Sequence, residues 1–242
     1  YVTRPRITPD YPGDTHMKSL WKALIKFGLC FALLIIPFLV NQKPVYAKAL
    51  TAKNYRKNQE DMGVVLLAVN WGRKWGCGKY ENAQLAGLKF ELFPESGEPA
   101  NELSMLELKW PSHLFVDPVF KNYGFIVKPG QYAMTGFSVK VANYDPINVG
   151  YFKAAKNDLI KDGKPEGGTF TVASGEVVYV GNFFLDCYES PIPWRYYSEG
   201  RDGFLKHVGE FKQQYKFLAN KEVVYRLFKT KNFGRDYELP DN

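Results

Sequence analysis

Two cysteines are the residues whose type and context most directly indicate a reaction. Cys30 lies within an apolar N-terminal segment, which leaves Cys77 and Cys187 as an even pair. If that segment directs the chain to an oxidising compartment, we expect the two thiols to form a disulfide. The bridge would close a loop of about 110 residues, for which chain-entropy models give roughly 4 to 5 kcal/mol of stabilisation. Two buried free thiols are the alternative, and neither cysteine has the CxxC spacing of a metal site.

Histidine and carboxylate side chains form no catalytic or metal-binding pattern. Beyond the N-terminal segment the chain has His113 and His207, and neither lies in HExxH or another ligand spacing. Nucleophile elbows, phosphate loops and dinucleotide fingerprints are absent from the sequence as well. Carboxylates such as Asp117, Glu176 and Asp186 cannot be paired from sequence, so they give a glycosidase little support. We therefore predict no catalytic residue, no metal ligand and no cofactor.

Aromatic residues are frequent, at 16% of the chain, which makes them the best candidates for a recognition surface. Trp71, Trp75 and Trp194 occur in loop-like contexts. If exposed, they could stack on sugar rings or anchor a protein partner. Packing in the core is the alternative for each of them.

The elements that must position these residues are strands, because apolar residues recur with a period of two between Gly63 and Cys187. The parity of the pattern changes at Gly136, which indicates a β-bulge. After a polar segment at 48–62, the pattern predicts an antiparallel β-sandwich of about seven or eight strands over residues 63–190. The expected strands are 63–70, 88–92, 106–110, 125–127, 132–134, 137–141, 169–172 and 176–185.

Two turns are explicit in the sequence, and each joins two expected strands. In one, Pro129 presets φ and Gly130 accepts a positive φ, and in the other Gly175 has the second of these roles. Residues 143–168 between them are polar and predict a long loop with a helical turn near 152–160.

The pattern changes after Cys187. Pro191 and Pro193 predict an irregular linker at 191–200, and a helical period follows over 201–230, with a tail at 231–242. Asp202 is available as the helix N-cap. The apolar stripe consists of Phe204, Val208, Phe211, Tyr215 and Leu218. We expect this helical segment to pack on the sandwich, and a partner-binding helix would show the same pattern.

Residues 17–47 have the features of a secretory leader: a basic front, an apolar run at 27–40, and small residues at Val45 and Ala47. The run is shorter than the roughly 20 apolar residues that cross a membrane as a helix, so cleavage is favoured over an uncleaved anchor. Residues 1–16 precede a leader that is already complete, and we expect them to be a non-native upstream extension. A longer leader is the alternative.

The leader also accounts for much of the positive charge. It and the extension contain six of the 32 Lys and Arg residues and two of the 25 Asp and Glu residues, which leaves 26 basic against 23 acidic residues. Because no basic run remains, we expect no nucleic-acid partner.

Two segments carry a resemblance to a known group of proteins. FIVKPGQYAMTGFSV (125–139) and FTVASGEVVYVGNFFLDC (170–187) resemble a hairpin pair in uncharacterised exported bacterial β-sandwich proteins, which are similar to carboxypeptidase-regulatory-like and PEGA-type domains. The matching residues are Pro129, Gly130 and Tyr132 in the first segment, and Gly175, Glu176 and Tyr179 in the second. The resemblance implies a fold and an envelope setting, and it transfers no catalytic residue.

Together these observations predict an exported bacterial envelope protein of the periplasm, the outer envelope or the extracellular space. We expect a non-enzymatic binding or assembly module for a protein or glycan partner, with membrane contact only through an uncleaved leader. The alternative is an envelope hydrolase acting on a glycan or peptide, which requires ionisable groups with perturbed pKa values in one pocket.

Overall fold

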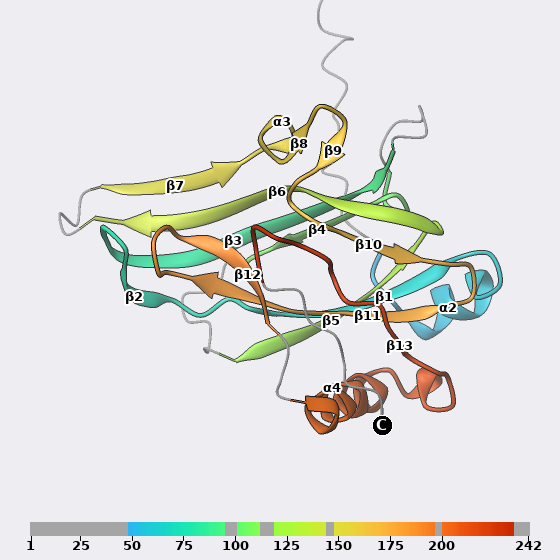
Figure 1. The fold of residues 1–242 in the computed structure, drawn as a ribbon. Coiled ribbons are helices and arrows are strands. Elements are labelled where there is room, and N and C mark those ends of the chain that lie inside the picture. The colour runs from blue at the N-terminus through green and yellow to red at the C-terminus, as the bar shows by residue number, and fades with distance from the viewer. Residues whose placement is uncertain (1–47, 95–100, 112–118, 144–147, 197–199, 235–242) are drawn as a thin grey trace, which may run out of the picture. The chain divides into compact units, whose positions relative to one another are not determined.

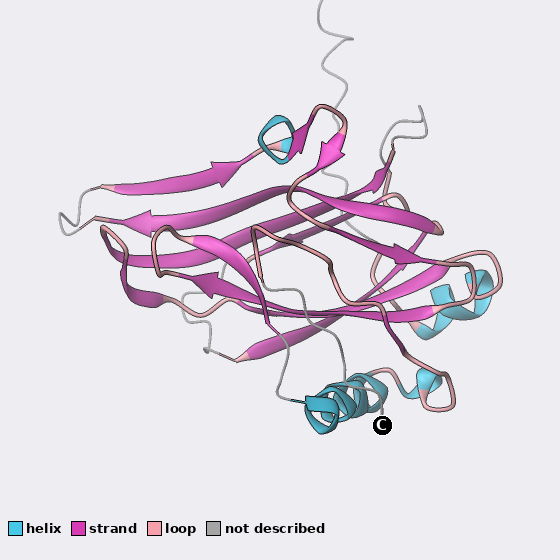
Figure 2. Cartoon of the chain, in the orientation of Figure 1, coloured by secondary structure: helices cyan, strands magenta, loops and turns pink. Residues whose placement is uncertain are grey.

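Two β-sheets face each other, and helices cover the outer side of one of them (Figure 1). The computed structural model describes residues 48–94, 101–111, 119–143, 148–196 and 200–234. The predicted extension at 1–16 and the predicted leader at 17–47 lie outside these residues. Figure 2 shows how far strands outnumber helices, and the predicted mainly-β sandwich with a C-terminal helix is confirmed.

The first sheet, sheet A, has the strand order β12-β11-β1-β5, with β13 pairing on β11. Its strands are β1 (Gly63–Asn70), β5 (Phe120–Val127), β11 (Val177–Asp186), β12 (Ile192–Tyr196) and β13 (Val224–Tyr225). The pairing differs from the predicted antiparallel pattern in two places, because β11 runs parallel to β1 and to β13. A parallel neighbour requires a long connection, and here all six strands of sheet B lie between β1 and β11 in the sequence.

The second sheet, sheet B, has β3 and β6 at its centre. β4 and β2 share the outer edge of β3, and β7 and β10 share the outer edge of β6. Its strands are β2 (Lys74–Cys77), β3 (Tyr80–Phe93), β4 (Met105–Lys109), β6 (Gly130–Ala142), β7 (Val149–Ala154) and β10 (Thr169–Val172). The bulge predicted at Gly136 is confirmed by a shift of register, where Lys89 faces Gly136 but Phe90 faces Met134.

Both predicted turns connect the two sheets, so neither closes the hairpin that the resemblance implied. Pro129 and Gly130 lead from β5 in sheet A to β6 in sheet B, and Gly175 lies between β10 in sheet B and β11 in sheet A. Gly130 and Gly175 both have a positive φ, as their turns require. Just after the first turn, the buried Tyr132 hydroxyl donates a 2.8 Å hydrogen bond to the Lys128 carbonyl.

Three segments are more ordered than the sequence pattern predicted. The polar segment contains α2 (Ala52–Asn58), which buries Tyr55. The long loop contains β7, α3 (Lys156–Leu159), β8 (Ile160–Lys161) and β9 (Lys164–Pro165). The linker contains β12, which pairs with β11 because Pro193 tolerates an edge position. In each case, contacts with a segment distant in sequence stabilise structure that the local pattern does not predict.

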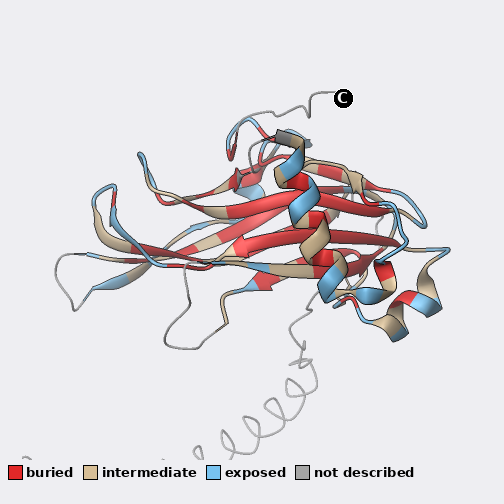
Figure 3. Ribbon diagram, turned by 90° about the horizontal axis from the view of Figure 1, so that it is seen from below, coloured by how far each residue is buried: buried red, intermediate tan, exposed pale blue. Residues whose placement is uncertain are grey.

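The predicted helical segment at 201–230 is correct only in its first half. α4 (Gly200–Gln214) and the 3-10 helix η2 (Lys216–Leu218) are followed by the short strand β13. Since α4 begins at Gly200, Asp202 lies in the first turn and is not the N-cap. Figure 3 looks onto this side of the molecule and shows α4 lying across mostly buried strands. The predicted stripe packs there, with Phe204 and Phe211 fully buried.

A polar chain beneath α4 ties the helix to sheet A. The Tyr179 hydroxyl donates to the Asn182 side-chain oxygen at 2.7 Å, and Asn182 lies 3.2 Å from a ring nitrogen of His207 on α4. Tyr179 and Asn182 are fully buried, so these contacts satisfy polar atoms that burial would otherwise penalise.

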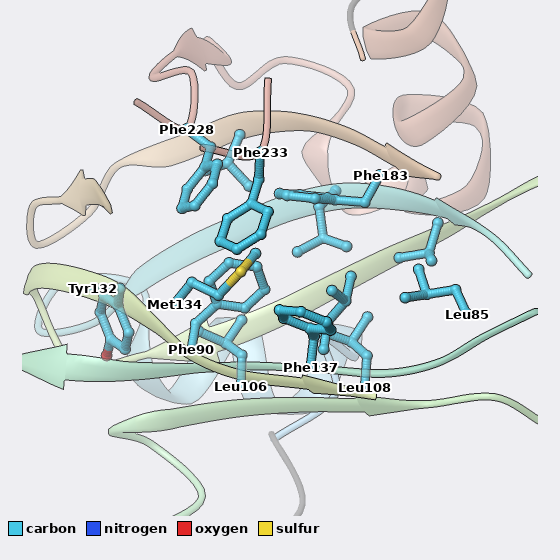
Figure 4. Close-up of a cluster of buried hydrophobic side chains, with 14 of the residues drawn as sticks. Leu85, Phe90, Leu106, Leu108, Tyr132, Met134, Phe137, Phe183, Phe228 and Phe233 are labelled. Carbon is cyan, nitrogen blue, oxygen red and sulfur yellow. The ribbon is translucent and has the colours of Figure 1, made fainter. Parts of the chain in front are cut away.

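The space between the sheets is completed by the C-terminal strap, which we define as residues 228–233. Phe228 is fully buried, and its ring packs against Phe90 and Phe183 with centroids 5.6 and 5.5 Å apart (Figure 4). The strap contacts both sheets, since the Phe228 amide donates to Val180 of β11 and Lys229 pairs with Thr169 of β10. The strap falls in the predicted helical segment and tail, so the predicted tail contributes to the core.

Candidate functional site

The three predicted binding tryptophans do not form one surface. Trp71 is fully buried, and its indole N–H donates a 2.7 Å hydrogen bond to the Tyr123 hydroxyl, so the prediction that it is exposed is wrong. Trp75 is 66% exposed on β2, beside Arg73. Trp194 is half-buried on β12, opposite Phe184. Trp75 is therefore the one exposed aromatic ring among the three.

The predicted disulfide is confirmed. The sulfur atoms of Cys77 and Cys187 lie 2.07 Å apart, and the bridge joins the end of β2 in sheet B to the residue after β11 in sheet A. A disulfide is compatible with an oxidising compartment. Tyr188 follows the bridge and is 87% exposed.

The remaining predicted candidates are dispersed. His113 and Asp117 lie outside the described residues, and His207 lies on α4, where it ends the polar chain described above. Within the described ranges, no three His, Cys, Asp or Glu side chains gather as they would around a metal ion. In the same part of the chain, no helix is both long and apolar enough for a membrane span.

A groove of about 480 Å³ crosses the outer face of sheet B, and we call it the sheet-B groove. It runs over four neighbouring strands in the order β4, β3, β6 and β7, which are all visible in Figure 1. Its lining includes Gly87, Lys109, Trp110, Ser138 and Tyr151. The opposite face of the same strands contributes Leu88, Leu108, Phe137, Val139 and Phe152 to the core.

The register of the four strands aligns one row of side chains across the groove. Lys109 faces Gly87, Gly87 faces Ser138, and Ser138 faces Lys153. Directly paired residues share one face of a sheet, so this row presents two small residues between two lysines. The Ser138 hydroxyl packs over Gly87, since a Cβ atom added to Gly87 would lie only 2.9 Å from its oxygen.

Two β-bulges lie under the groove and interrupt its regular pleat. One places Ala86 as the extra residue of β3, and the other places Thr135 as the extra residue of β6. Ala86 and Thr135 both line the groove. Bulges re-aim side chains and are frequent beside functional sites, so two of them in adjacent strands distinguish this face from an ordinary solvated sheet.

Aromatic rings flank the groove on both sides. Trp110 follows β4 and its amide donates to the bulged Ala86 carbonyl at 3.0 Å, while Tyr151 on β7 is 56% exposed. Lys140 pairs with Tyr151 in the β6–β7 register, and its ammonium lies 5.7 Å from the centre of the Trp110 ring. The Lys153 ammonium lies 4.8 Å from the centre of the Tyr151 ring.

Two polar atoms beneath the groove make no hydrogen bond within the described part of the chain. They are the indole nitrogen of Trp110 and the hydroxyl of Thr135, and both residues line the groove. Buried polar atoms are nearly always paired in native proteins. Both atoms are inaccessible to solvent, so a ligand in the groove would not reach them directly.

Ion pairs hold the acidic side chains near the groove. Glu91 accepts from Lys89 at 2.6 Å and from Lys156 at 2.9 Å. Burial raises the pKa of Glu91, but the hydrogen bonds and charges of the two lysines outweigh burial and hold the pKa below its ordinary value. Glu107 is paired with Lys109 at 3.0 Å.

A second hollow of about 700 Å³ lies between β10 and the C-terminal strap. Its lining includes Thr230 and Asn232, whose side chains already donate to backbone carbonyls of Gly167 and Glu166. These polar groups are satisfied within the chain, so the sheet-B groove is the stronger candidate for a ligand site.

No protein-family model, curated protein or solved structure matches this chain at a significant level. The groove is therefore the feature from which a function can be inferred.

Proposed function

We propose that this chain is an exported, non-enzymatic binding module that holds a glycan chain in the sheet-B groove. The observation that carries the proposal is the combination of two flanking residues with aromatic rings, Trp110 and Tyr151, and a floor that includes the small residues Gly87 and Ser138. Sugar rings pair an apolar face with a rim of hydroxyl groups. Aromatic rings suit that face, and dispersed polar groups suit the rim.

The strand arrangement favours a glycan over an extended peptide. A peptide that adds to a sheet needs an edge strand with unpaired backbone groups. The central strands of the groove, β3 and β6, pair with each other and each has a further neighbour on its outer side. Recognition above these two strands must therefore come from side chains, which can bind the hydroxyl groups of a sugar.

Export is supported by the leader features at 17–47 and by the Cys77–Cys187 bridge. The resemblance to exported β-sandwich proteins supports the same setting. We propose the bacterial envelope as the place where the groove meets its ligand.

The carboxylates near the groove do not favour the alternative, an envelope hydrolase. A glycosidase needs one carboxylic acid with a raised pKa beside a second carboxylate. The pKa of Glu91 is lowered, and two lysines clamp its carboxylate. Such a group stays ionised at neutral pH and cannot donate a proton to a leaving group.

The test measures binding of the full chain to a panel of soluble polysaccharides by affinity gel electrophoresis. We expect Tyr151→Ala and Trp110→Ala to weaken retention roughly tenfold, because each removes one stacking surface. Trp75→Ala is the matched control, since Trp75 is an exposed ring outside the groove. Urea unfolding of each variant separates a lost binding surface from a lost fold.

Two results would contradict the proposal. One is the absence of binding to every polysaccharide of the panel by a folded wild-type protein. The other is loss of binding in Trp75→Ala with full binding in Tyr151→Ala, which would transfer recognition to the rings beside the disulfide.

A further inference from the structure

We infer that the sheet-B groove selects an acidic glycan, and that Lys109 and Lys153 hold a sugar carboxylate above the Gly87–Ser138 floor. This inference depends on the glycan-binding function proposed above. It adds the chemical class of the ligand and names the residues that bind its charged group.

The charge around the groove is predominantly positive. Among the described residues at or beside it, lysines outnumber glutamates. The lysines are Lys89, Lys109, Lys140, Lys153 and Lys156, and the glutamates are Glu91 and Glu107. The acidic side chains are also the less exposed ones, since the Glu91 side chain is 11% exposed and the Lys109 side chain 51%. A ligand in the groove therefore meets more positive than negative charge.

Two lysines lie at the ends of the row of paired residues that crosses the groove. Lys109 on β4 and Lys153 on β7 face each other across Gly87 and Ser138, and the register places these four residues side by side. Four neighbouring strands span about 14 Å from the first to the last. Two long lysine side chains at the ends of this span can both reach a ligand group above its middle. Between them the floor carries no bulky side chain, and the Ser138 hydroxyl can donate a hydrogen bond.

Both lysine side chains are accessible to solvent, since the Lys109 side chain is 51% exposed and Lys153 is exposed. Lys109 donates to Glu107 at 3.0 Å, and ion pairs that water reaches are weak. Lys153 is exposed and stands 4.8 Å from the centre of the Tyr151 ring, so a carboxylate bound there would lie next to a ring that can stack on the same sugar.

The chemistry of the lining favours a carboxylate over a phosphate. Phosphate sites are usually built from arginine forks or from free backbone N–H groups. The described lining residues include no arginine, and apart from the two bulges β3 and β6 pair with each other along the groove. Ammonium groups from two sides and one hydroxyl suit the single charge of a uronic acid.

The experiment compares the full chain with two double variants against an oligogalacturonate and a neutral chitin oligosaccharide, by titration calorimetry. In Lys109→Gln/Lys153→Gln we expect affinity for the oligogalacturonate to fall about three- to tenfold, with a weaker dependence on salt. Lys57→Gln/Lys206→Gln is the control, because it removes the same charge from exposed lysines on α2 and α4, on the side of sheet A.

Each outcome separates the charge inference from the proposed function. Stronger binding of the oligogalacturonate than of the neutral oligosaccharide, lost in the groove variant alone, supports the inference. Equal binding of both sugars would overturn the inference and leave the glycan-binding function in place. Binding of neither sugar, or of polyglutamate instead, would overturn both. Preference for a phosphate-bearing teichoic acid would overturn the choice of a carboxylate.

Discussion

Removal of the Cys77–Cys187 bridge should lower the free energy of unfolding by about 3 to 5 kcal/mol. The two cysteines are 110 residues apart in sequence, so the bridge restricts the unfolded chain over more than half of the region that the structure describes. The chain-entropy relation gives about 4.7 kcal/mol at 25 °C for a loop of this size. A typical domain has only roughly 5 to 15 kcal/mol in total, so the unbridged protein should be folded but marginal.

The assay is urea unfolding followed by tryptophan fluorescence, to which the buried Trp71 contributes. It compares the oxidised protein, the reduced protein and Cys77→Ala/Cys187→Ala. The reduced protein is the control because it retains both sulfur atoms, whereas the double variant also loses packing at Cys77, which is fully buried. If the bridge acts on the unfolded state, both unbridged forms should also have a larger m value, because their unfolded chains expose more surface.

A loss below about 1 kcal/mol in the reduced protein, with an unchanged m value, would refute this reasoning. It would mean that the unfolded chain is already compact, or that the native bridge is strained. A large loss in the double variant alone would attribute the effect to packing around Cys77 and not to loop closure.

Two further predictions concern the core and the ion pairs beside the groove. Phe228→Ala should cost about 3 to 5 kcal/mol in urea unfolding, because the ring is fully buried between the sheets, whereas Tyr188→Ala at an 87% exposed position should change stability by less than about 0.5 kcal/mol. Similar losses in the two variants would mean that the C-terminal strap is not part of the core. Because Lys156 and Lys89 hold the pKa of Glu91 below its unfolded value, Glu91 contributes stability above its unfolded pKa, and this contribution disappears as the pH falls through the lowered value. Glu91→Gln should therefore flatten the acid side of the stability profile measured by urea unfolding, and a profile as steep as that of the wild type would contradict this assignment.

Local chemistry explains which parts of the fold were predictable. Alternating side chains revealed most strands, the parity change at Gly136 revealed a bulge, and an even pair of cysteines after a predicted leader indicated the bridge. Turn chemistry showed where Pro129 and Gly130 redirect the chain, but a turn sets local dihedral angles and does not determine which sheet the next strand joins. The parallel pairing of β1 with β11 and the strand at 192–196 likewise depend on distant partners.

The groove could not be predicted as a unit. Lys109, Gly87, Ser138 and Lys153 come from four strands, and only the register brings them together. The parity change near Gly136 was the one local signal of this face. Trp71 was predicted as an exposed candidate but is buried. It follows a buried strand, and its indole N–H donates to the Tyr123 hydroxyl, more than fifty residues away in sequence.

The C-terminal strap has a consequence for the order in which the chain acquires its structure. Phe228 and Phe233 fill space between sheets whose first strand begins at Gly63, so the core lacks two aromatic side chains until residue 233 is available. Contacts this distant in sequence form slowly. A chain synthesised from its N-terminus would therefore keep its main core incomplete until the C-terminal strap has left the ribosome.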